Sequence, residues 1–403
     1  MRLPDVPARA EALPAMWIAP AAASSRGYLN SASAGLPSAP VLEAVLTYLR
    51  REAELGALDA AAEAAPRLEA AYDDAARLIG ARPDEVAFVE SGNRGLQALL
   101  AAVPLAPGDR VLVARAEWGG SLAMLSGLDG VSVEPMPTDG RGVLDLDAVR
   151  AMADGRVRLI LLTWCPATNG LVNPAAEVGA LAAEVGATFI LDACQAVGQL
   201  PVDVGTLGCH GLVASGRKWL RGPRGTALLY ASRDFLARTC PAMPDQFGAP
   251  WSAGTWRPRA DARRFETGEA FMAGRFGLGV AIEGALAVGV DRLQARISAL
   301  AGRLREGLAA LPGVVVHDTG PVLSGIVTFG VADVSADAVR DGLAARGISI
   351  GSRGAGYAPF DMAARGLTEV ARVSPHVFND EAEIDATIAA VAALRDAGRS
   401  VAG

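Results

Sequence analysis

Short β-rich runs alternate with helical stretches from about residue 86 to residue 230, and this alternation limits the fold more than any other feature. Strands that alternate with helices favour crossover units with parallel strands, so we expect an α/β domain built on a parallel sheet. Such sheets bind ligands beyond the carboxyl ends of their strands. The expected strands are Val86–Val89, Arg110–Val113, Val131–Val133, Leu159–Leu162, Thr188–Leu191, Gly211–Ala214 and Ala227–Tyr230, separated by helices such as Ser91–Val103, Asp145–Ala153 and Ala175–Val185.

The pattern changes on both sides of this region. A helix is expected over 41–80, and residues 236–268, rich in Pro, Trp and Arg, predict a long irregular loop of functional use. Helix follows from about Leu278 to Leu311, and a final helix begins after Asn379. We therefore expect an N-terminal arm (1–30), a large domain (31–275) and a small C-terminal α/β domain (276–403) with an interdomain helix. The strands expected in the small domain are Val314–His317, Ser324–Phe329, Ile348–Ile350 and Ala371–Ser374.

Charge and hydropathy exclude several classes of partner. The net charge of −7 argues against binding to nucleic acid or to anionic membranes. No run of about 18 uncharged apolar residues exists, so we expect no membrane span. The stretch Ala12–Ser25 is fairly apolar, but Pro14 and Pro20 interrupt it, so a cleaved signal peptide is the weaker interpretation.

The cysteines and histidines do not form a metal-ligand pattern. Four Cys residues lack a CxxC pair, and only three His residues occur, so we expect no metal site. Free thiols fit a reducing compartment, which predicts a cytoplasmic protein.

Lysine occurs once in the chain, at Lys218, while Arg supplies the other 36 of the 37 basic residues. A guanidinium stays protonated, so Arg cannot replace Lys where an amine must lose its proton and attack a carbonyl. One lysine can survive by chance, but its singularity also points to Schiff-base chemistry.

The segment Leu191–Tyr230 carries the densest cluster of polar groups. Asp192 follows one expected strand, with Gln195 three residues on, and Ser215, Arg217 and Lys218 follow the next strand. Because parallel strands place their carboxyl ends at one edge of the sheet, a carboxylate, an amide and the single amine should converge there.

This spacing resembles the fold-type I enzymes that use pyridoxal 5'-phosphate, and within them the class V aminotransferase group. That group includes cysteine desulfurases, isopenicillin N epimerase-like proteins and C–S lyases. The resemblance implies a large domain with a mainly parallel seven-stranded sheet, a small C-terminal α/β domain and a homodimer with shared active sites. Matching motifs in chain order are YLNSASAG (28–35), VESGNRG (89–95), TNGLVNP (168–174), D-x-x-Q from Asp192, S-x-R-K before G-P-x-G, FETGE (265–269) and VARVSPHVFNDEAEID (370–385).

The resemblance also implies roles for single residues. Lys218 would hold the cofactor covalently and later carry the Cα proton, while Asp192 would keep the pyridine nitrogen protonated and Gln195 would hydrogen-bond the phenolic oxygen. Arg372 would bind the substrate α-carboxylate as a bidentate pair. The other expected cofactor contacts are Asn93, Arg94, Trp118, Ser215, Arg217 and, from the partner subunit, Thr267, and the other expected substrate contacts are Ser33 and Trp256.

Each of these side chains also has a purely structural interpretation. Asp192 can be a helix N-cap, Trp118 and Trp164 can be core aromatics, and Arg372 can be a solvated surface charge. Cys194 is most simply a small buried residue.

Departures from the family pattern bear on the activity. The segment 351–369 lacks the nucleophilic Cys that desulfurases carry before the Arg-containing strand. Ala167 stands where the family usually has Asn, with Thr168 and Asn169 following, and Arg217 stands where many relatives have His.

The sequence therefore looks most similar to C–S lyases, such as those that act on hercynylcysteine sulfoxide in ergothioneine biosynthesis. The expected reaction is β-elimination from an S-substituted cysteine or its sulfoxide, giving a sulfur product, pyruvate and ammonia. The alternatives are an aminotransferase or an amino-acid epimerase at the same site, and, from another class, a non-catalytic relative that binds the cofactor.

Overall fold

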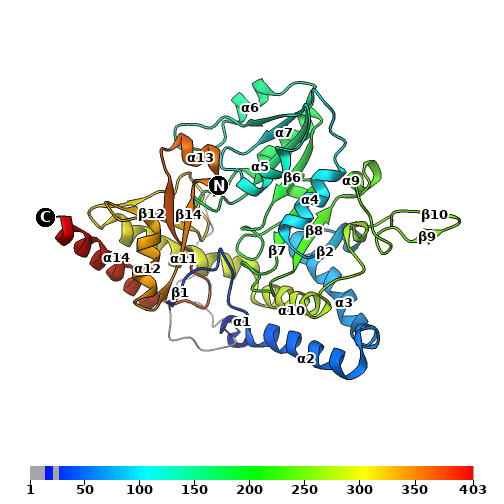
Figure 1. Cartoon of the computed structure of the whole chain (residues 1–403), viewed down its shortest axis with the longest axis horizontal. Helices are drawn as coiled ribbons and strands as arrows, with labels where there is room; N and C mark the ends of the chain where they lie inside the picture. Colours follow the sequence, from blue (N-terminus) through cyan, green and yellow to red (C-terminus); the bar gives the residue numbers. More distant parts are fainter. Residues whose placement is uncertain (1–13, 21–26, 403) are drawn as a thin grey trace.

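The computed structural model describes residues 14–20 and 27–402 (Figure 1). Most of the expected N-terminal arm, and half of the apolar stretch Ala12–Ser25, lies outside the described residues. Within them, the arm contributes the short helix α1 (Ala15–Ile18) and the strand β1 (Gly27–Tyr28).

A seven-stranded sheet forms the centre of the molecule, in the order β2-β8-β7-β6-β5-β3-β4. Only β8 runs antiparallel to its neighbours, so the sheet is mainly parallel, as expected. The expected strands are confirmed, with ends that differ by two residues at most. Their bounds are β2 (Val86–Val89), β3 (Arg110–Val113), β4 (Ser132–Pro135), β5 (Val157–Thr163), β6 (Thr188–Asp192), β7 (Gly211–Ser215) and β8 (Ala227–Ala231).

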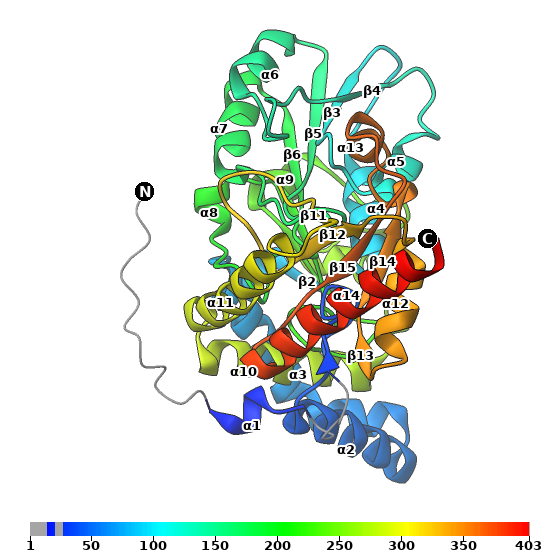
Figure 2. The same cartoon turned by 90° about the vertical axis from the view of Figure 1, so that its left-hand side faces the viewer.

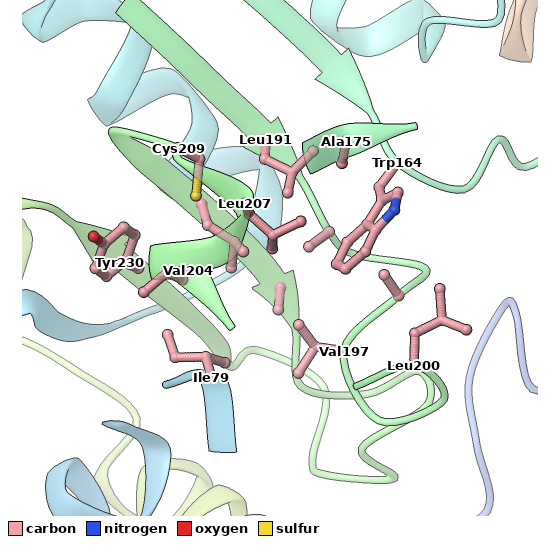
Figure 3. Packing of buried hydrophobic residues seen from close by; sticks show 14 of the residues in the cluster. Ile79, Trp164, Ala175, Leu191, Val197, Leu200, Val204, Leu207, Cys209 and Tyr230 are labelled. Carbon is pink, nitrogen blue, oxygen red and sulfur yellow. The ribbon is translucent and has the colours of Figure 1, made fainter. Parts of the chain in front are cut away.

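Both faces of this sheet are covered, which explains the nearly continuous apolar runs of its strands. In β5, Ile160 and Leu162 join one core, whereas Leu159 and Leu161 join the core on the opposite face. The first core also contains Trp164, which packs near Leu200 and Val197 (Figure 3). The interpretation of Trp164 as a core aromatic is therefore correct.

Two long helical regions each divide into two helices, which corrects the expectation for 41–80 and for Leu278–Leu311. The first forms α2 (Ala39–Leu55) and α3 (Ala57–Ile79), and the second forms α10 (Met272–Val288) and α11 (Val290–Ala309). Gly56 and Gly289 separate them with φ angles of 83° and 89°, which interrupt a right-handed helix and favour glycine. The expected helices between the sheet strands are confirmed.

The remaining helices cover the two sheets. Their bounds are α4 (Gly92–Ala102), α5 (Gly119–Leu125), α6 (Leu146–Met152), α7 (Ala175–Val185), α8 (Val204–Leu207), α9 (Arg233–Arg238), α12 (Ala336–Ala344), α13 (Pro359–Ala364) and α14 (Glu381–Ala402), with 3₁₀ turns at η1 (Pro83–Glu85), η2 (Ala262–Phe265) and η3 (Ala355–Tyr357).

A second, antiparallel sheet lies in the C-terminal part, in the order β11-β12-β15-β14. Helices α11, α12 and α14 lie over it in Figure 2. Its strands are β11 (Val314–Val316), β12 (Val327–Val331), β14 (Gly351–Gly354) and β15 (Glu369–Val373). This arrangement agrees with a large and a small α/β unit, while the boundary after residue 275 stays a prediction.

Two strands near residue 350 depart from the expectation. The strand expected at Ile348–Ile350 forms β13 (Ile348–Ser349), which pairs in parallel with β1 rather than with the C-terminal sheet. The sheet uses β14 instead, whose sequence GSRG has no β-branched residue to predict a strand. These pairings bring the N-terminal segment beside the C-terminal unit.

The expected irregular loop over 236–268 contains a hairpin formed by β9 (Trp251–Ser252) and β10 (Thr255–Trp256). Its two turn residues, Ala253 and Gly254, both have positive φ angles, as a two-residue type I′ hairpin requires. Figure 1 shows this hairpin extending away from the body of the molecule.

In the described part of the chain, no individual helix has the length and apolar character to cross a membrane. Helices α10 and α11 reach that length and composition only together, and they meet at an angle of 82°.

Candidate active site

A cavity of about 330 Å³ opens at the carboxyl ends of β6 and β7. This is the edge of the sheet at which the sequence places its polar cluster. The described residues that line it are Ala32, Ser33, Asn93, Trp118, Thr163, Cys165, Ala167, Asp192, Cys194, Gln195, Ser215, Arg217, Lys218, Arg224, Arg353, Tyr357 and Arg372.

Asp192, the last residue of β6, and Gln195, on the turn that follows, line the cavity. Asp192 is buried, and its Oδ1 accepts a hydrogen bond from the Cys194 amide at 2.9 Å. The Gln195 side chain is also held: Nε2 donates to the Ala32 carbonyl at 2.9 Å, and Oε1 accepts from Trp219 Nε1 at 2.8 Å. The carboxylate is therefore fixed at the end of its strand without an ion pair in the described structure.

Lys218 lies on the turn after β7, beneath the N-terminal segment. Gly35 N donates to Arg217 O at 2.8 Å, and a Cβ added at Gly35 would lie 2.5 Å from Lys218 O. Only a glycine allows the two backbones to approach so closely. Burial lowers the pKa of the Lys218 amine, which favours the neutral, nucleophilic form.

The start of α4 meets the end of β7 at the cavity wall. A Cβ added at Gly92 would lie 2.4 Å from Cys194 Sγ and 2.9 Å from Ser215 Oγ. The first amides of a helix have no intrahelical acceptor, and a helix N-terminus attracts anions. With Asn93, Ser215 and Arg217 beside it, this corner can hold a phosphate group.

Trp118 caps the start of α5 and lines the cavity, with its backbone amide bonded to Thr163 Oγ1 at 3.1 Å. Beneath it lies Glu117, a fully buried carboxyl that accepts from Thr163 N and Thr163 Oγ1, both at 2.8 Å. Burial, together with the nearby Asp192 charge, raises the pKa of Glu117 to about 8. The sequence does not indicate Glu117 as a site residue, because a glutamate in a turn between strand and helix predicts an exposed residue.

Three side chains from separate parts of the chain converge on the opposite wall. Arg372 Nη2 donates to Ser33 Oγ at 2.8 Å, and Arg372 Nη1 donates to the Ala167 carbonyl at 3.2 Å. Arg353 Nη2 also donates to Ser33 Oγ, at 2.5 Å. Arg372 is 1% exposed, so its interpretation as a solvated surface charge is wrong. The sequence does not indicate Arg353 as a site residue, since the segment that carries it has no strand pattern.

Three expected site residues do not line this cavity. Arg94 is exposed and bonds to Gln97, and Thr267 Oγ1 donates to Glu90 at 2.9 Å in a separate hollow of about 230 Å³. Trp256 lies on the β9–β10 hairpin and is 55% exposed. Contacts of Thr267 or Trp256 with a bound ligand stay predictions that require a second subunit.

Of the three residues in the segment 167–169, one lines the cavity. Asn169 bonds to Thr319 through Nδ2 at 2.8 Å and does not line the cavity, and Thr168 is buried away from it. Ala167 lines the cavity and presents its carbonyl to Arg372. At the position where the family usually has Asn, the chain therefore presents no polar side chain to the cavity.

Two of the four thiols, Cys165 and Cys194, line the cavity, although neither lies in the segment 351–369. Burial and the Asp192 charge raise the pKa of Cys194 to about 12 and raise that of Cys165 as well. Burial therefore favours the protonated, poorly nucleophilic form of both thiols.

The donor set fits pyridoxal 5'-phosphate. The α4 N-terminus and Ser215 offer an anion cradle, Asp192 offers a carboxylate for a protonated ring nitrogen, and Lys218 offers the only amine. Two buried guanidinium nitrogens, Nε of Arg353 and Nε of Arg372, have no hydrogen-bond partner, as expected where a ligand anion is needed.

Comparisons with known proteins give the family and the fold of this chain. The family described as "Aminotransferase class-V" matches residues 27–387. A "Probable hercynylcysteine sulfoxide lyase" of Mycobacterium tuberculosis is 33% identical over 91% of this chain and 89% of its own length. A "Cysteine desulfurase" of Cronobacter sakazakii is 28% identical over 90% and 91% of the two chains. In fold, the apo structure of the cysteine desulfurase from Thermococcus onnurineus NA1 superposes with a TM-score of 0.85, at 24% identity, over 92% of this chain and 95% of that one.

Proposed function

The chain belongs to the class-V aminotransferase family, with pyridoxal 5'-phosphate as its cofactor, and from that premise we propose that it is a C–S lyase. The proposed substrate is an S-substituted cysteine or its sulfoxide. The bond between Cβ and sulfur breaks, the sulfur leaves with its substituent, and the remaining three-carbon unit takes up water to give pyruvate and ammonia.

The observation that carries the proposal is an amino-acid site without a desulfurase nucleophile. Lys218, Asp192 and Arg372 line one cavity, while the segment 351–369, which contributes Arg353 and Tyr357 to the lining, contains no cysteine. The two thiols within the cavity are held protonated by burial. A persulfide-forming reaction needs a thiolate, so cleavage with release of the sulfur product is the better-supported outcome.

Each residue has a task in this reaction. The bound cofactor supplies an electron sink for the pair released at Cα. Arg372 binds the substrate α-carboxylate, with Ser33 and the Ala167 carbonyl fixing the orientation of its guanidinium. Lys218, whose pKa is lowered by burial, removes the proton from Cα.

Asp192 and Trp118 act on the cofactor rather than on the substrate. The Asp192 carboxylate would hold the proton on the ring nitrogen, which keeps the ring electron-poor. Trp118 would stack on the ring, and its position is fixed through Thr163 by the buried Glu117. Ser215, Arg217 and Asn93 would hold the phosphate.

A homodimer completes the proposal. Thr267 and Trp256 lie outside the cavity of their own subunit, on surfaces from which they would reach the site of a partner. In that arrangement Thr267 would contact the phosphate, and Trp256 would contact the S-substituent.

The test is to incubate the holoenzyme with L-cysteine, with a panel of S-substituted cysteines and with their sulfoxides, while measuring pyruvate, alanine and the cofactor absorbance. We expect pyruvate in proportion to the sulfur product, with the absorbance restored at the end. Alanine with sulfur retained on the protein would replace the proposal with a desulfurase. Conversion of the cofactor to its amine form without pyruvate would replace it with an aminotransferase.

A further inference from the structure

Two guanidinium groups share one hydroxyl in the wall of the cavity that carries Ser33, Arg353 and Arg372. Arg353 and Arg372 donate to Ser33 Oγ from Nη2 at 2.5 Å and 2.8 Å. Their strands explain this proximity: Arg372 on β15 pairs with Gly351 on β14, so Arg353, two residues along, is its diagonal neighbour on the same face. Gly351 has no side chain to separate them.

No anion in the described structure balances this pair of charges. The hydrogen-bond acceptors of Arg353 and Arg372 are a hydroxyl and two backbone carbonyls, and Nε of each guanidinium is buried without a partner. Burial lowers the pKa of both guanidinium groups, and the charge of Arg353 lowers the pKa of Arg372 further. Unpaired buried charges are costly, so a bound anion would relieve the repulsion.

The cavity as a whole has more positive charge than the cofactor and a simple amino acid would neutralise. Five of its described lining residues are basic, and Asp192 is the only carboxylate among them. Of the five basic residues, Lys218 is the amine that would hold the cofactor, and Arg224 is exposed to solvent. The ring nitrogen would take Asp192, the phosphate would take Arg217 and the start of α4, and the α-carboxylate would take Arg372. Arg353 is left without an acid, beside the α-carboxylate site.

Arg353 is also prepared to bind an anion. Its guanidinium lies over the Tyr357 ring, with Cζ 4.9 Å from the ring centroid, and Nη1 donates to the Ser352 carbonyl at 2.5 Å. These contacts fix the planar donor group without neutralising it. Tyr357 is 42% exposed, so this part of the wall is at the cavity opening, where a substituent on Cβ would extend.

We propose that Arg353 binds a second acidic group carried by the S-substituent, so that the substrates are cysteine conjugates with an acidic substituent. This inference rests on the proposed function for the reaction, but the binding contact itself requires only that an amino acid occupies the site. Arg353 is then a specificity-determining residue, whereas Arg372 serves every amino acid alike.

The test uses two matched pairs of ligands on the holoenzyme. S-carboxymethyl-L-cysteine and S-carbamoylmethyl-L-cysteine differ in one charge and report turnover as pyruvate. L-2-aminoadipate and its side-chain amide are their counterparts with CH₂ in place of sulfur, and report binding through the change in cofactor absorbance. We expect the acid to exceed the amide by about tenfold or more in both kcat/KM and affinity.

The variants are Arg353→Gln, Arg353→Lys and, as a control on the exposed surface, Arg346→Gln. Arg353→Gln should bring the acid-to-amide ratio close to one, with the amide affected less than about threefold, and Arg353→Lys should restore part of the preference. Arg346→Gln should behave as the unsubstituted protein. Equal cofactor absorbance in all four proteins shows that each has folded.

The outcomes separate this inference from the proposed function. One outcome is that the acid and amide conjugates give pyruvate at equal rates and that Arg353→Gln leaves both rates unchanged. This result would overturn the role of Arg353 and leave the lyase intact. A second outcome is that no conjugate gives pyruvate, but aminoadipate binds more tightly than its amide and Arg353→Gln removes that preference. This result would overturn the lyase and support Arg353 as the binding residue for the acidic group. Equal affinity for aminoadipate and its amide would contradict the acidic subsite directly.

Discussion

The two walls of the cavity are built in different ways. The cofactor wall carries Asp192, Gln195, Ser215 and Lys218 at the ends of two adjacent parallel strands and on the turns that follow them, within 27 residues of sequence. The substrate wall carries Ser33, Arg353 and Arg372, which come together through the pairing of β14 with β15, the pairing of β1 with β13 and the bridge between Asn30 and Ser374. The first wall follows from local strand order, and the second from contacts between distant segments.

This difference predicts a division of labour. Changes in the cofactor wall should remove the chemistry for every substrate, whereas changes in the substrate wall should alter which amino acid binds and leave the cofactor in place. Three substitutions test this division, beginning with the largest expected effect, and a fourth tests the protonation of the buried Glu117 carboxyl.

Lys218→Ala should lower kcat by about 10³-fold or more, because the chain has no other amine to carry the Cα proton. Lys218→Arg is the matched variant: it keeps the positive charge but cannot lose its proton, so it should be equally inactive. Pyruvate formation gives the rates, and cofactor retention after borohydride reduction and dialysis gives the covalent link. A Lys218→Arg protein with a tenth of the original rate would contradict the assignment.

Asp192→Asn should retain the cofactor and lose about 10²-fold or more in kcat, since a neutral amide would not hold the ring nitrogen protonated. The side chain keeps its size and its contact with the Cys194 amide, so the fold should be preserved. Full activity in this variant would show that Asp192 is only a helix or turn cap.

Arg372→Gln should reduce kcat/KM by about 10²-fold for acidic and neutral conjugates alike, while the cofactor absorbance stays unchanged. The comparison with Arg353→Gln separates the general site from the specific one, because only the latter should discriminate between acid and amide. Loss of the cofactor from Arg372→Gln would contradict the division between the two walls.

Glu117→Gln should have the smallest effect, on the pH dependence of stability in the cofactor-free protein. The pKa of Glu117 is raised to about 8 by burial, so between its ordinary value and pH 8 the folded state binds a proton that the unfolded state has lost. The free energy of unfolding should therefore fall as pH rises through this window. Glu117→Gln should remove this decline. In denaturant titrations at pH 5 and pH 8, the free energy of unfolding of the unsubstituted protein should fall by about 1–3 kcal/mol more than that of the variant. Parallel pH profiles for the two proteins would contradict the buried, protonated state.

The cofactor wall could be predicted from sequence because its information is local. The polar groups were predicted to converge at one edge of the sheet from the strand ends, the spacing from Asp192 to Lys218 and the single lysine. The structure places all these groups in one cavity. Family resemblance added Arg372, although its short polar surroundings alone favoured a surface charge.

The substrate wall could be predicted only in part. Arg353 lies in GSRG, which has neither the alternation nor the β-branched residues of a strand, and its role depends on register with β15. Glu117 was missed for a related reason: its burial results from packing between α5 and β5, which no local pattern reveals. The broken helices at Gly56 and Gly289 did carry a local signal, since a glycine near the middle of a long helical pattern favours an interruption.

The most direct test of the central claim is to reduce the holoenzyme with borohydride, digest it and map the modified peptide, with and without an S-substituted cysteine present. We expect one reduced cofactor on Lys218 in the free enzyme. When the conjugate is added first, we expect the reduced cofactor on the substrate amine instead. Cofactor bound elsewhere, or a label on Lys218 that the substrate leaves unchanged, would contradict the assignment of this cavity as the site of reaction.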